Sequence, residues 1–347
     1  MVPVLDLSRR LARFANEFAE VSSSVLRSGQ MLLGPRTNQF ETEFAGWSGH
    51  RHAIAVSSGA AAIQLGLYVS GVGAGDEVLV PAFTAVPTAS AVCALGAVPV
   101  PVEVEADTAA LDPAAARRAL TALTRAVVPV HLYGRAVSVP DLGVTVIEDA
   151  AQAHGAVRNV GSIATAYSFY PTKNLGGIGD GGAVVTDDDE VANRLRSMRV
   201  HGMNAHYVHC EVSQNFRMSE LEAAWLSLTL PHLHNDNERR REIARHYHSA
   251  APQLRWHPDH ESHVFHLCVF RSANRAATQE RLRDHGIATA VHYPLALTQQ
   301  PAYRQFARAA CPTAEAWAAE CVTVPCFAEM TDSEVERIGE ALRLEVE

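Results

Sequence analysis

The chain has 347 residues and a formal net charge of −9 at pH 7, and its residues are 48% hydrophobic and 19% charged. This length suits one large domain with a smaller one attached, and the apolar content excludes wholesale disorder. Acidic and basic residues are interspersed, so we expect no basic surface for nucleic acid or for an anionic membrane.

The N-terminal third alternates helical and strand-like patterns. Met1–Asp6 lacks the basic and apolar regions of a signal peptide, and a helical periodicity from Leu11 to Val25 ends at Gly29. Short apolar runs then alternate with Ala-rich helical stretches such as Gly59–Val69 and Pro113–Leu123. The runs that predict strands are Ala53–Val56, Val78–Val80, Val98–Val102, Ala126–Val130, Val144–Ile147, Ala166–Phe169 and Ala183–Thr186. Strands that alternate with helices predict an α/β fold, with a mainly parallel sheet covered by helices on both faces.

One uncharged stretch, Val78–Val102, has the length of a membrane span. It contains four prolines and Gly96, however, which a spanning helix tolerates poorly. A strand, a loop, a helix and a second strand of a buried core explain the same pattern, and we expect no membrane partner.

The pattern changes near Ser219, where Ser219 and Glu222 predict a capping box for a helix that ends at Pro231. The C-terminal elements that we then expect are a helix at Asn235–Ala250, an alternating strand at His263–Phe270, a helix closed by Gly286, and a last helix capped by Thr331 and Glu334. We therefore predict a large domain at 1–232 and a small α+β domain at 233–347.

Six cysteines lack the spacing of a zinc site or of a redox motif, which favours a reducing, cytoplasmic compartment. Histidines are numerous, but their spacing is poor for metal binding. His263 and His266, for example, should point to opposite faces of the predicted strand. We expect no metal site.

Lys173 is the only lysine among 29 basic residues. Arginine can replace a solvated lysine, but it cannot lose its proton at working pH and attack a carbonyl. A single lysine in a loop after a strand therefore indicates a Schiff-base amine, whose pKa burial or cationic neighbours would lower. An accident of codon usage is the alternative.

Asp149 follows the apolar run Val144–Ile147, at the carboxyl end of a predicted parallel strand, where open α/β sheets bind ligands. A carboxylate fixed there could keep the ring nitrogen of pyridoxal phosphate protonated. The alternative is that Asp149 caps the next helix.

Two glycine-containing segments are candidate phosphate sites. Ser58-Gly59-Ala60 lies between a strand and a helix, whose first backbone amides form a natural phosphate seat. Gly177, Gly179 and Gly182 match the dinucleotide fingerprint, but a strand-like run follows them instead of a helix. We interpret the second segment as a tight loop after the lysine.

These blocks together resemble the DegT/DnrJ/EryC1/StrS family of sugar aminotransferases, which have the aspartate aminotransferase fold (fold type I). The most specific are the segments 148–155 (EDAAQAHG), 168–175 (SFYPTKNL) and 215–220 (NFRMSE), and the likeness extends to His292-Tyr293-Pro294.

The resemblance implies that pyridoxal 5'-phosphate is carried as a Schiff base on Lys173 and that Asp149 binds its ring nitrogen. It implies that Gln152 lies near the phenolic oxygen, and that Ser168 and the turn at Ser58, Gly59 and Ala60 hold the phosphate. Asn215 would reach in from a second subunit, so that a homodimer shares its active sites. Candidate substrate residues are Arg196, Arg199, Arg217, His292 and Tyr293.

The chain departs from the family pattern at three site positions. Ala60 replaces a threonine, Ala85 replaces an aromatic residue that covers the cofactor ring, and Thr298 stands where a histidine is often found. These departures concern cofactor affinity and substrate identity more than the chemistry.

The resulting prediction is an aminotransferase that moves an amino group from glutamate or glutamine to a keto-sugar, nucleotide-linked, in amino-sugar or antibiotic biosynthesis. A keto-cyclitol acceptor, or another reaction of the same cofactor on a sugar, is the nearest alternative. A non-catalytic sensor or regulator that kept the fold is the alternative from a different class.

Overall fold

The structure is a computed structural model that describes residues 1–138, 141–156 and 161–345. The chain begins with three helices, α1 (Leu7–Arg13), α2 (Ala15–Ser28) and α3 (Pro35–Ser48). The single helix predicted around Leu11–Val25 is therefore interrupted, because Phe14 has non-helical backbone angles and caps both α1 and α2. Gly29 ends α2 as predicted, with a left-handed φ of 66° that glycine adopts without strain.

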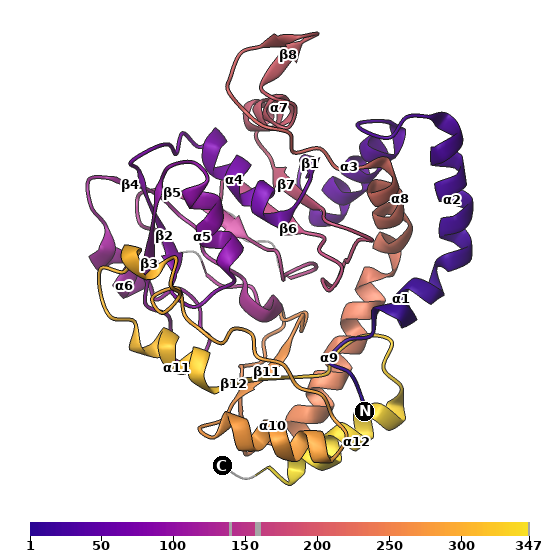
Figure 1. The fold of residues 1–347 in the computed structure, drawn as a ribbon, viewed down its shortest axis with the longest axis vertical. Coiled ribbons are helices and arrows are strands. Elements are labelled where there is room, and N and C mark those ends of the chain that lie inside the picture. Colours follow the sequence, from indigo (N-terminus) through magenta and orange to yellow (C-terminus); the bar gives the residue numbers. More distant parts are fainter. Residues whose placement is uncertain (139–140, 157–160, 346–347) are drawn as a thin grey trace.

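A seven-stranded sheet forms the centre of the large N-terminal part (Figure 1). Its strands are β1 (His52–Val56), β2 (Glu77–Pro81), β3 (Val98–Val102), β4 (Thr124–Val127), β5 (Thr145–Asp149), β6 (Ala164–Ser168) and β7 (Gly182–Thr186). Their spatial order is β1-β7-β6-β5-β4-β2-β3, and only β7 runs antiparallel to its neighbours. The predicted mainly parallel sheet is confirmed. The uncharged stretch 78–102 forms β2, a loop, α5 and β3 within it.

Helices cover both faces of this sheet. They include α4 (Gly59–Val69), α5 (Val86–Cys93), α6 (Pro113–Ala119), α7 (Asp189–Met198) and α8 (Glu220–Thr229), with a 3-10 turn at Leu132–Gly134. Side chains alternate along β1: Ile54 belongs to the core under α4, whereas Ala53 and Ala55 belong to the core under α3 and α8. Because both faces of the sheet are covered, β1 is apolar from Ala53 to Val56.

The C-terminal part forms a second, smaller layer (Figure 1). A 3-10 turn (Leu230–His232) leads into the long helix α9 (Leu233–Ala250). The antiparallel strands β10 (Arg255–Trp256), β11 (Cys268–Arg271) and β12 (Cys321–Val324) form a sheet in that order. Three helices, α10 (Arg275–Asp284), α11 (Pro312–Glu320) and α12 (Asp332–Arg343), and a 3-10 turn (Arg304–Phe306) complete it. Among the helices of the described residues, none is long and apolar enough to cross a membrane.

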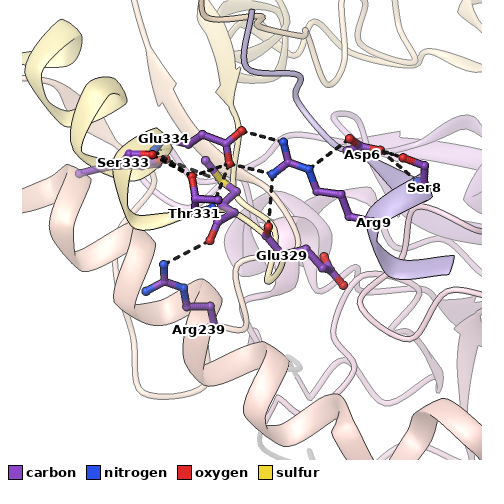
Figure 2. Close-up of polar contacts among 10 residues, drawn as sticks. Asp6, Ser8, Arg9, Arg239, Glu329, Thr331, Ser333 and Glu334 are labelled. Carbon is purple, nitrogen blue, oxygen red and sulfur yellow. Dashed lines mark hydrogen bonds and ion pairs between the residues drawn. The ribbon is translucent and has the colours of Figure 1, made fainter. Parts of the chain in front are cut away.

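The N-terminal segment joins the two parts. Val2 pairs with Ile287 and belongs to the C-terminal core. Arg9 of α1 donates two hydrogen bonds of 2.7 Å to Glu334 in the first turn of α12 (Figure 2). Glu334 also completes the predicted capping box with Thr331. Residues from both ends of the chain thus hold the C-terminal part against the large sheet.

Two local predictions were wrong. Residues 263–267 are not part of a strand, because Phe265 has a φ of 42° and its ring stacks on that of His263, so β11 begins only at Cys268. The capping box at Ser219 is half formed: Ser219 accepts a hydrogen bond from the Glu222 amide, but the Glu222 carboxylate accepts one from Ile178 instead.

A short hairpin, β8 (Met203–Ala205) and β9 (Val208–His209), projects from the body of the molecule beyond α7 (Figure 1). Its tip carries Tyr207, which is 79% exposed, and the returning chain carries Val212, which is 91% exposed.

Candidate active site

A cavity of about 710 Å³ lies at the carboxyl ends of the central strands. β5 ends at Asp149 and β6 at Ser168, and both residues line the cavity. Lys173 lines it too, together with Gly59, Ala60 and Gln152. The carboxyl edge of a parallel sheet therefore collects residues from segments far apart in the sequence, as expected for an open α/β fold.

Lys173 lies in a turn that follows β6. Its amide donates to the Tyr170 carbonyl at 2.8 Å, and Arg10 of α1 donates to the carbonyls of Lys173 (2.8 Å) and Pro171 (3.3 Å). Burial lowers the pKa of the Lys173 amine to about 8, and the nearby Asp149 carboxylate opposes that shift. A far larger fraction of the amine is therefore neutral, and nucleophilic, near neutral pH than in a solvated lysine.

Asp149 is 4% exposed. One carboxylate oxygen accepts a hydrogen bond from the Thr88 hydroxyl (2.7 Å) and the other from the Ala151 amide (3.1 Å). Burial raises the pKa of Asp149, while the bonds from Thr88 and Ala151 act in the opposite direction. The alternative interpretation as a helix cap fails, because no helix follows Asp149 in the described residues 150–156.

The N-terminus of α4 forms another wall. Ser58 caps this helix by accepting a hydrogen bond from the Ala61 amide at 3.1 Å. The first-turn residues Gly59 and Ala60 line the cavity, and first-turn amides have no partner within their own helix. A Cβ at Gly59 would lie 2.5 Å from the Cβ of Ser168, so glycine is required for this close approach. The backbone amides at the N-terminus of α4 therefore suit a phosphate group.

Gln152 is held by two tyrosines opposite the seat. Its side-chain oxygen accepts a hydrogen bond from the Tyr133 amide (2.6 Å), and its amide group donates to the Tyr293 hydroxyl (2.9 Å). Burial raises the pKa of Tyr293 to about 12, and lowers the pKa of the adjacent His292 to about 4. Both groups are therefore neutral at physiological pH, and both line the cavity.

These residues fit pyridoxal phosphate. The amine of Lys173 can carry the aldehyde carbon, Asp149 can face the ring nitrogen, and the amides at Gly59 and Ala60 with Ser168 can hold the phosphate. Among the described residues no group of three or more His, Cys, Asp or Glu side chains could hold a metal ion. The fold and this cavity define the class of pyridoxal-phosphate-dependent aminotransferases.

Comparison with known proteins identifies the family. Residues 13–343 match the sequence pattern of the DegT/DnrJ/EryC1/StrS aminotransferase family. The chain belongs to this family, and its cofactor is pyridoxal 5'-phosphate.

The chain is similar to dTDP-3-amino-3,4,6-trideoxy-α-D-glucose transaminase of Streptomyces venezuelae, with 40% identity over 99% of this chain and 95% of that protein. It is 41% identical to the erythromycin biosynthesis sensory transduction protein EryC1 of Saccharopolyspora erythraea, over 93% of this chain and 94% of that one. The solved structure of NtdA from Bacillus subtilis, with bound cofactor PMP, aligns with a TM-score of 0.93 and 30% identity, over 98% of this chain and 84% of that one.

The structure does not bring every predicted residue to the cavity. Arg199 pairs with Glu41 and also donates to the Ala55 carbonyl at 3.0 Å, which is a structural role. Arg196 lines a separate surface depression. Asn215 and Arg217 lie at the base of the β8–β9 hairpin, where the Asn215 side chain accepts a hydrogen bond from Arg217 at 2.9 Å.

Ala85 does line the cavity, at the start of α5. The glycines that match the dinucleotide fingerprint form a loop, as predicted, because Gly182 opens β7 and no helix follows it directly. A Cβ at Gly177 would lie 1.5 Å from a carboxylate oxygen of Glu222, so packing against α8 accounts for this glycine.

Sequence reasoning missed three cavity-side residues. Thr88 bonds to Asp149 from 61 positions away, and Tyr133 holds Gln152 through its backbone. Arg240 of α9 also lines the cavity. Of these three residues only Tyr133 carried a signal in the sequence, because the segment 130–134 (VHLYG) also resembles the family, but that resemblance predicts no contact with Gln152.

Proposed function

We propose that this protein transfers an amino group from glutamate or glutamine to a keto-sugar, nucleotide-linked, in the biosynthesis of an amino sugar or of an antibiotic that contains one. The observation that carries the proposal is the buried Lys173 amine facing Asp149 in one cavity. The similarity to a dTDP-sugar transaminase over 99% of the chain supports the class of acceptor.

The protein's own residues perform the steps in the following way. The bound cofactor supplies the electron sink for the carbanion at the donor's α-carbon. The amine of Lys173, once displaced by the donor, removes the proton from that carbon and later returns a proton in the second half-reaction. The carboxylate of Asp149 would hold a proton on the ring nitrogen when the cofactor is bound. Gln152 is fixed by Tyr133 and Tyr293, so its amide is held rigidly beside the ring.

We further propose that two chains form a dimer with shared sites. Asn215 and Arg217 do not line the cavity of their own chain, and Asn215 is exposed at the base of a projecting hairpin. In a two-fold dimer these side chains would reach the phosphate side of the partner's cavity. We propose this role for Arg217. We do not propose Arg199 as a substrate residue, because the charge of Arg199 is already paired with Glu41.

The similarity to EryC1, which is described as a sensory transduction protein, favours one second candidate, namely a regulator that binds the cofactor without turnover. The deciding experiment adds glutamate or glutamine to the holo protein and records the visible spectrum of the cofactor. A spectral change that a keto-sugar nucleotide reverses supports the enzyme. If only a keto-cyclitol reverses the spectral change, the acceptor is a keto-cyclitol and not a keto-sugar nucleotide. If no amino donor changes the spectrum, the result favours the regulator.

A further inference from the structure

Arg240, in the middle of α9, is a buried cation that has no carboxylate partner in the part of the chain that the structure describes. Its side chain is 2% exposed, and its guanidinium donates hydrogen bonds only to the backbone carbonyls of Phe265 (3.3 Å) and Cys326. The arginines on either side are paired, Arg239 with Asp332 and Arg241 with Glu238. Within the described residues, no ion pair includes Arg240.

A second buried arginine adds to the positive charge. Arg10 is 7% exposed, and its nearest carboxylate is Glu329, with 3.7 Å between the charged atoms. Both Glu329 oxygens lack a hydrogen-bond partner among the described residues. Burial, and after it the charge of Arg240, lowers the pKa of Arg10. Two buried cations thus contribute positive charge to this region, and only Arg10 has a carboxylate within ion-pair distance among the described residues.

A buried charge without a partner is unfavourable, and it becomes favourable when an anion binds beside it. Arg240 lines the same cavity as Lys173. His266 lies within the field of both groups, since burial first, then Lys173 and then Arg240 lower its pKa. An anionic group of a ligand that reacts at Lys173 is therefore within reach of the free side of the Arg240 guanidinium.

We propose that Arg240 binds a carboxylate of the amino-acid donor. The inference rests on the proposed function and adds to it a residue that distinguishes the two substrates. An amino-acid donor carries a carboxylate on the carbon that reacts, whereas the negative charge of a nucleotide-linked keto-sugar is on the diphosphate, outside the sugar ring that reacts. Arg240 should therefore act in the donor half-reaction and leave the acceptor half-reaction nearly unchanged.

The test uses holo protein and the probe glutarate, which has both carboxylates of glutamate but no amine to react. Arg240→Met removes the charge from a side chain of similar length. Arg240→Lys keeps a positive charge but lacks the paired N–H donors of the guanidinium group. Arg239→Met is the matched control. Arg239, labelled in Figure 2, is the neighbouring residue in the same helix. It bonds on the surface to the Met330 carbonyl and to Asp332. Glutarate affinity is measured by calorimetry, and the two half-reactions are measured in single turnovers.

Arg240→Met should weaken glutarate binding and raise the glutamate concentration needed for half-maximal rate by about a hundredfold, since charge-assisted hydrogen bonds are lost. Arg240→Lys should weaken both by about tenfold. Arg239→Met should change neither by more than about twofold. Unchanged glutarate affinity in Arg240→Met, or an equal loss in both half-reactions, would overturn the proposal, because either result indicates a purely structural arginine.

If Arg240→Met does not fold, Arg240→Lys decides the question with altered donors. Glutamine lacks the side-chain carboxylate of glutamate, and glutamate α-amide lacks the main-chain one. One of these donors lacks the carboxylate that binds Arg240, and the change from glutamate to that donor should slow wild type more than it slows Arg240→Lys. Equal losses of rate in the two proteins would overturn the proposal. Absence of glutarate binding to wild type would overturn it too, while the reaction with glutamate in the same sample would report separately on the proposed function.

Discussion

Lys173 shows how much one residue can reveal in an arginine-rich sequence. Its identity as the only lysine and its place after an apolar run indicated a Schiff-base amine, and the structure buries that amine with a pKa lowered to about 8. This role could be predicted from the sequence because the residue type and the end of the preceding strand are both visible in the local sequence. The supporting contact from Arg10 to the Lys173 carbonyl could not be predicted, since it joins residues 163 positions apart.

The first prediction concerns the covalent attachment of the cofactor. Borohydride reduction of the holo protein should fix one cofactor per chain on the peptide that contains Lys173, because no other side-chain amine exists in the sequence. Peptide mass spectrometry after reduction is the measurement. Recovery of that peptide unmodified from yellow holo protein would contradict the assignment.

The lowered pKa of Lys173 predicts the pH dependence of cofactor uptake. Only the neutral amine attacks an aldehyde, so the rate at which cofactor-free protein binds pyridoxal phosphate should rise with pH and level off above about 8, well below the ordinary lysine value of 10.5. Stopped-flow absorbance provides the rate. In Asp149→Asn the midpoint should move to lower pH, because the carboxylate that raises the pKa is gone. An unshifted midpoint near that of free lysine would show that the amine is solvated.

Asp149 should matter through the ring nitrogen and not through packing. We expect Asp149→Ala to retain its fold yet to lose about a hundredfold or more in the half-reaction with the amino donor. Asp112→Ala is the control, because Asp112 caps α6 outside the cavity and should lower stability without changing the rate of chemistry. Turnover close to wild type in Asp149→Ala would remove the residue from the mechanism.

At the scale of elements, the periodicity of the sequence predicted the helices and strands that depend on residues close together in the chain. The central strands and α4 appeared close to their predicted bounds, because apolar runs between turn residues form the interior of a covered sheet. The failures occurred where tertiary contacts decide the outcome. Residues 263–267 alternate like a strand, yet His263 bonds to His257 and His266 to Asn174, and the backbone turns to permit these contacts.

Glu222 in α8 supports a prediction about stability and pH. Burial raises its pKa to about 7, the amides of Ile178 and Gly179 oppose this, and one carboxylate oxygen has no hydrogen-bond partner among the described residues. Because the folded pKa lies above the unfolded value of 4.5, its contribution to stability is full below about pH 4.5 and is lost as the pH rises through about 7.

Glu222→Gln mimics the protonated acid and should therefore stabilise the fold above pH 7, by at most about 3 kcal/mol, and have little effect near pH 5. Urea unfolding at pH 5 and pH 8.5 measures the difference. The control is Glu220→Gln in the same helix. Burial raises the pKa of Glu220, but hydrogen bonds from Thr37, Arg36 and Gly34 outweigh it and leave the pKa lowered. That variant should destabilise the fold by nearly the same amount at pH 5 and pH 8.5, because the ionised Glu220 contributes its stability above about pH 4.5. Destabilisation of Glu222→Gln at pH 8.5 would contradict the argument.

At the scale of the whole molecule, the division into domains at residue 232 stays our proposal, and the structure adds a detail that the sequence concealed. Val2 belongs to the C-terminal core, and Val4 and Leu5 line the cavity between the two parts. A local pattern cannot reveal this, because the pairing of Val2 with Ile287 spans almost the entire chain. The projecting hairpin was equally hidden, since its exposed apolar residues follow no period.

The last prediction concerns shared active sites and rests on Asn215, which lies outside its own chain's cavity at the base of the hairpin. If a two-fold dimer builds each site from both chains, Lys173→Ala and Asn215→Ala damage different chains of one site. A mixed dimer then has one site with both lesions and one with neither. Random re-pairing makes about half of the dimers mixed, so about a quarter of all sites should become intact.

Each variant prepared alone should be inactive or weak, the second through loss of a hydrogen bond to the phosphate. The experiment co-expresses the two variants, confirms mixed dimers by native mass spectrometry, and compares their activity with that of the separately prepared proteins. Lys173→Ala mixed with wild type at the same ratio should keep about half of the wild-type activity, which shows that a variant chain does not inactivate its partner's site. Recovery to about a quarter of wild-type activity supports composite sites. If mixed dimers form without any gain, Asn215 serves its own chain, and the dimer is not required for a complete site.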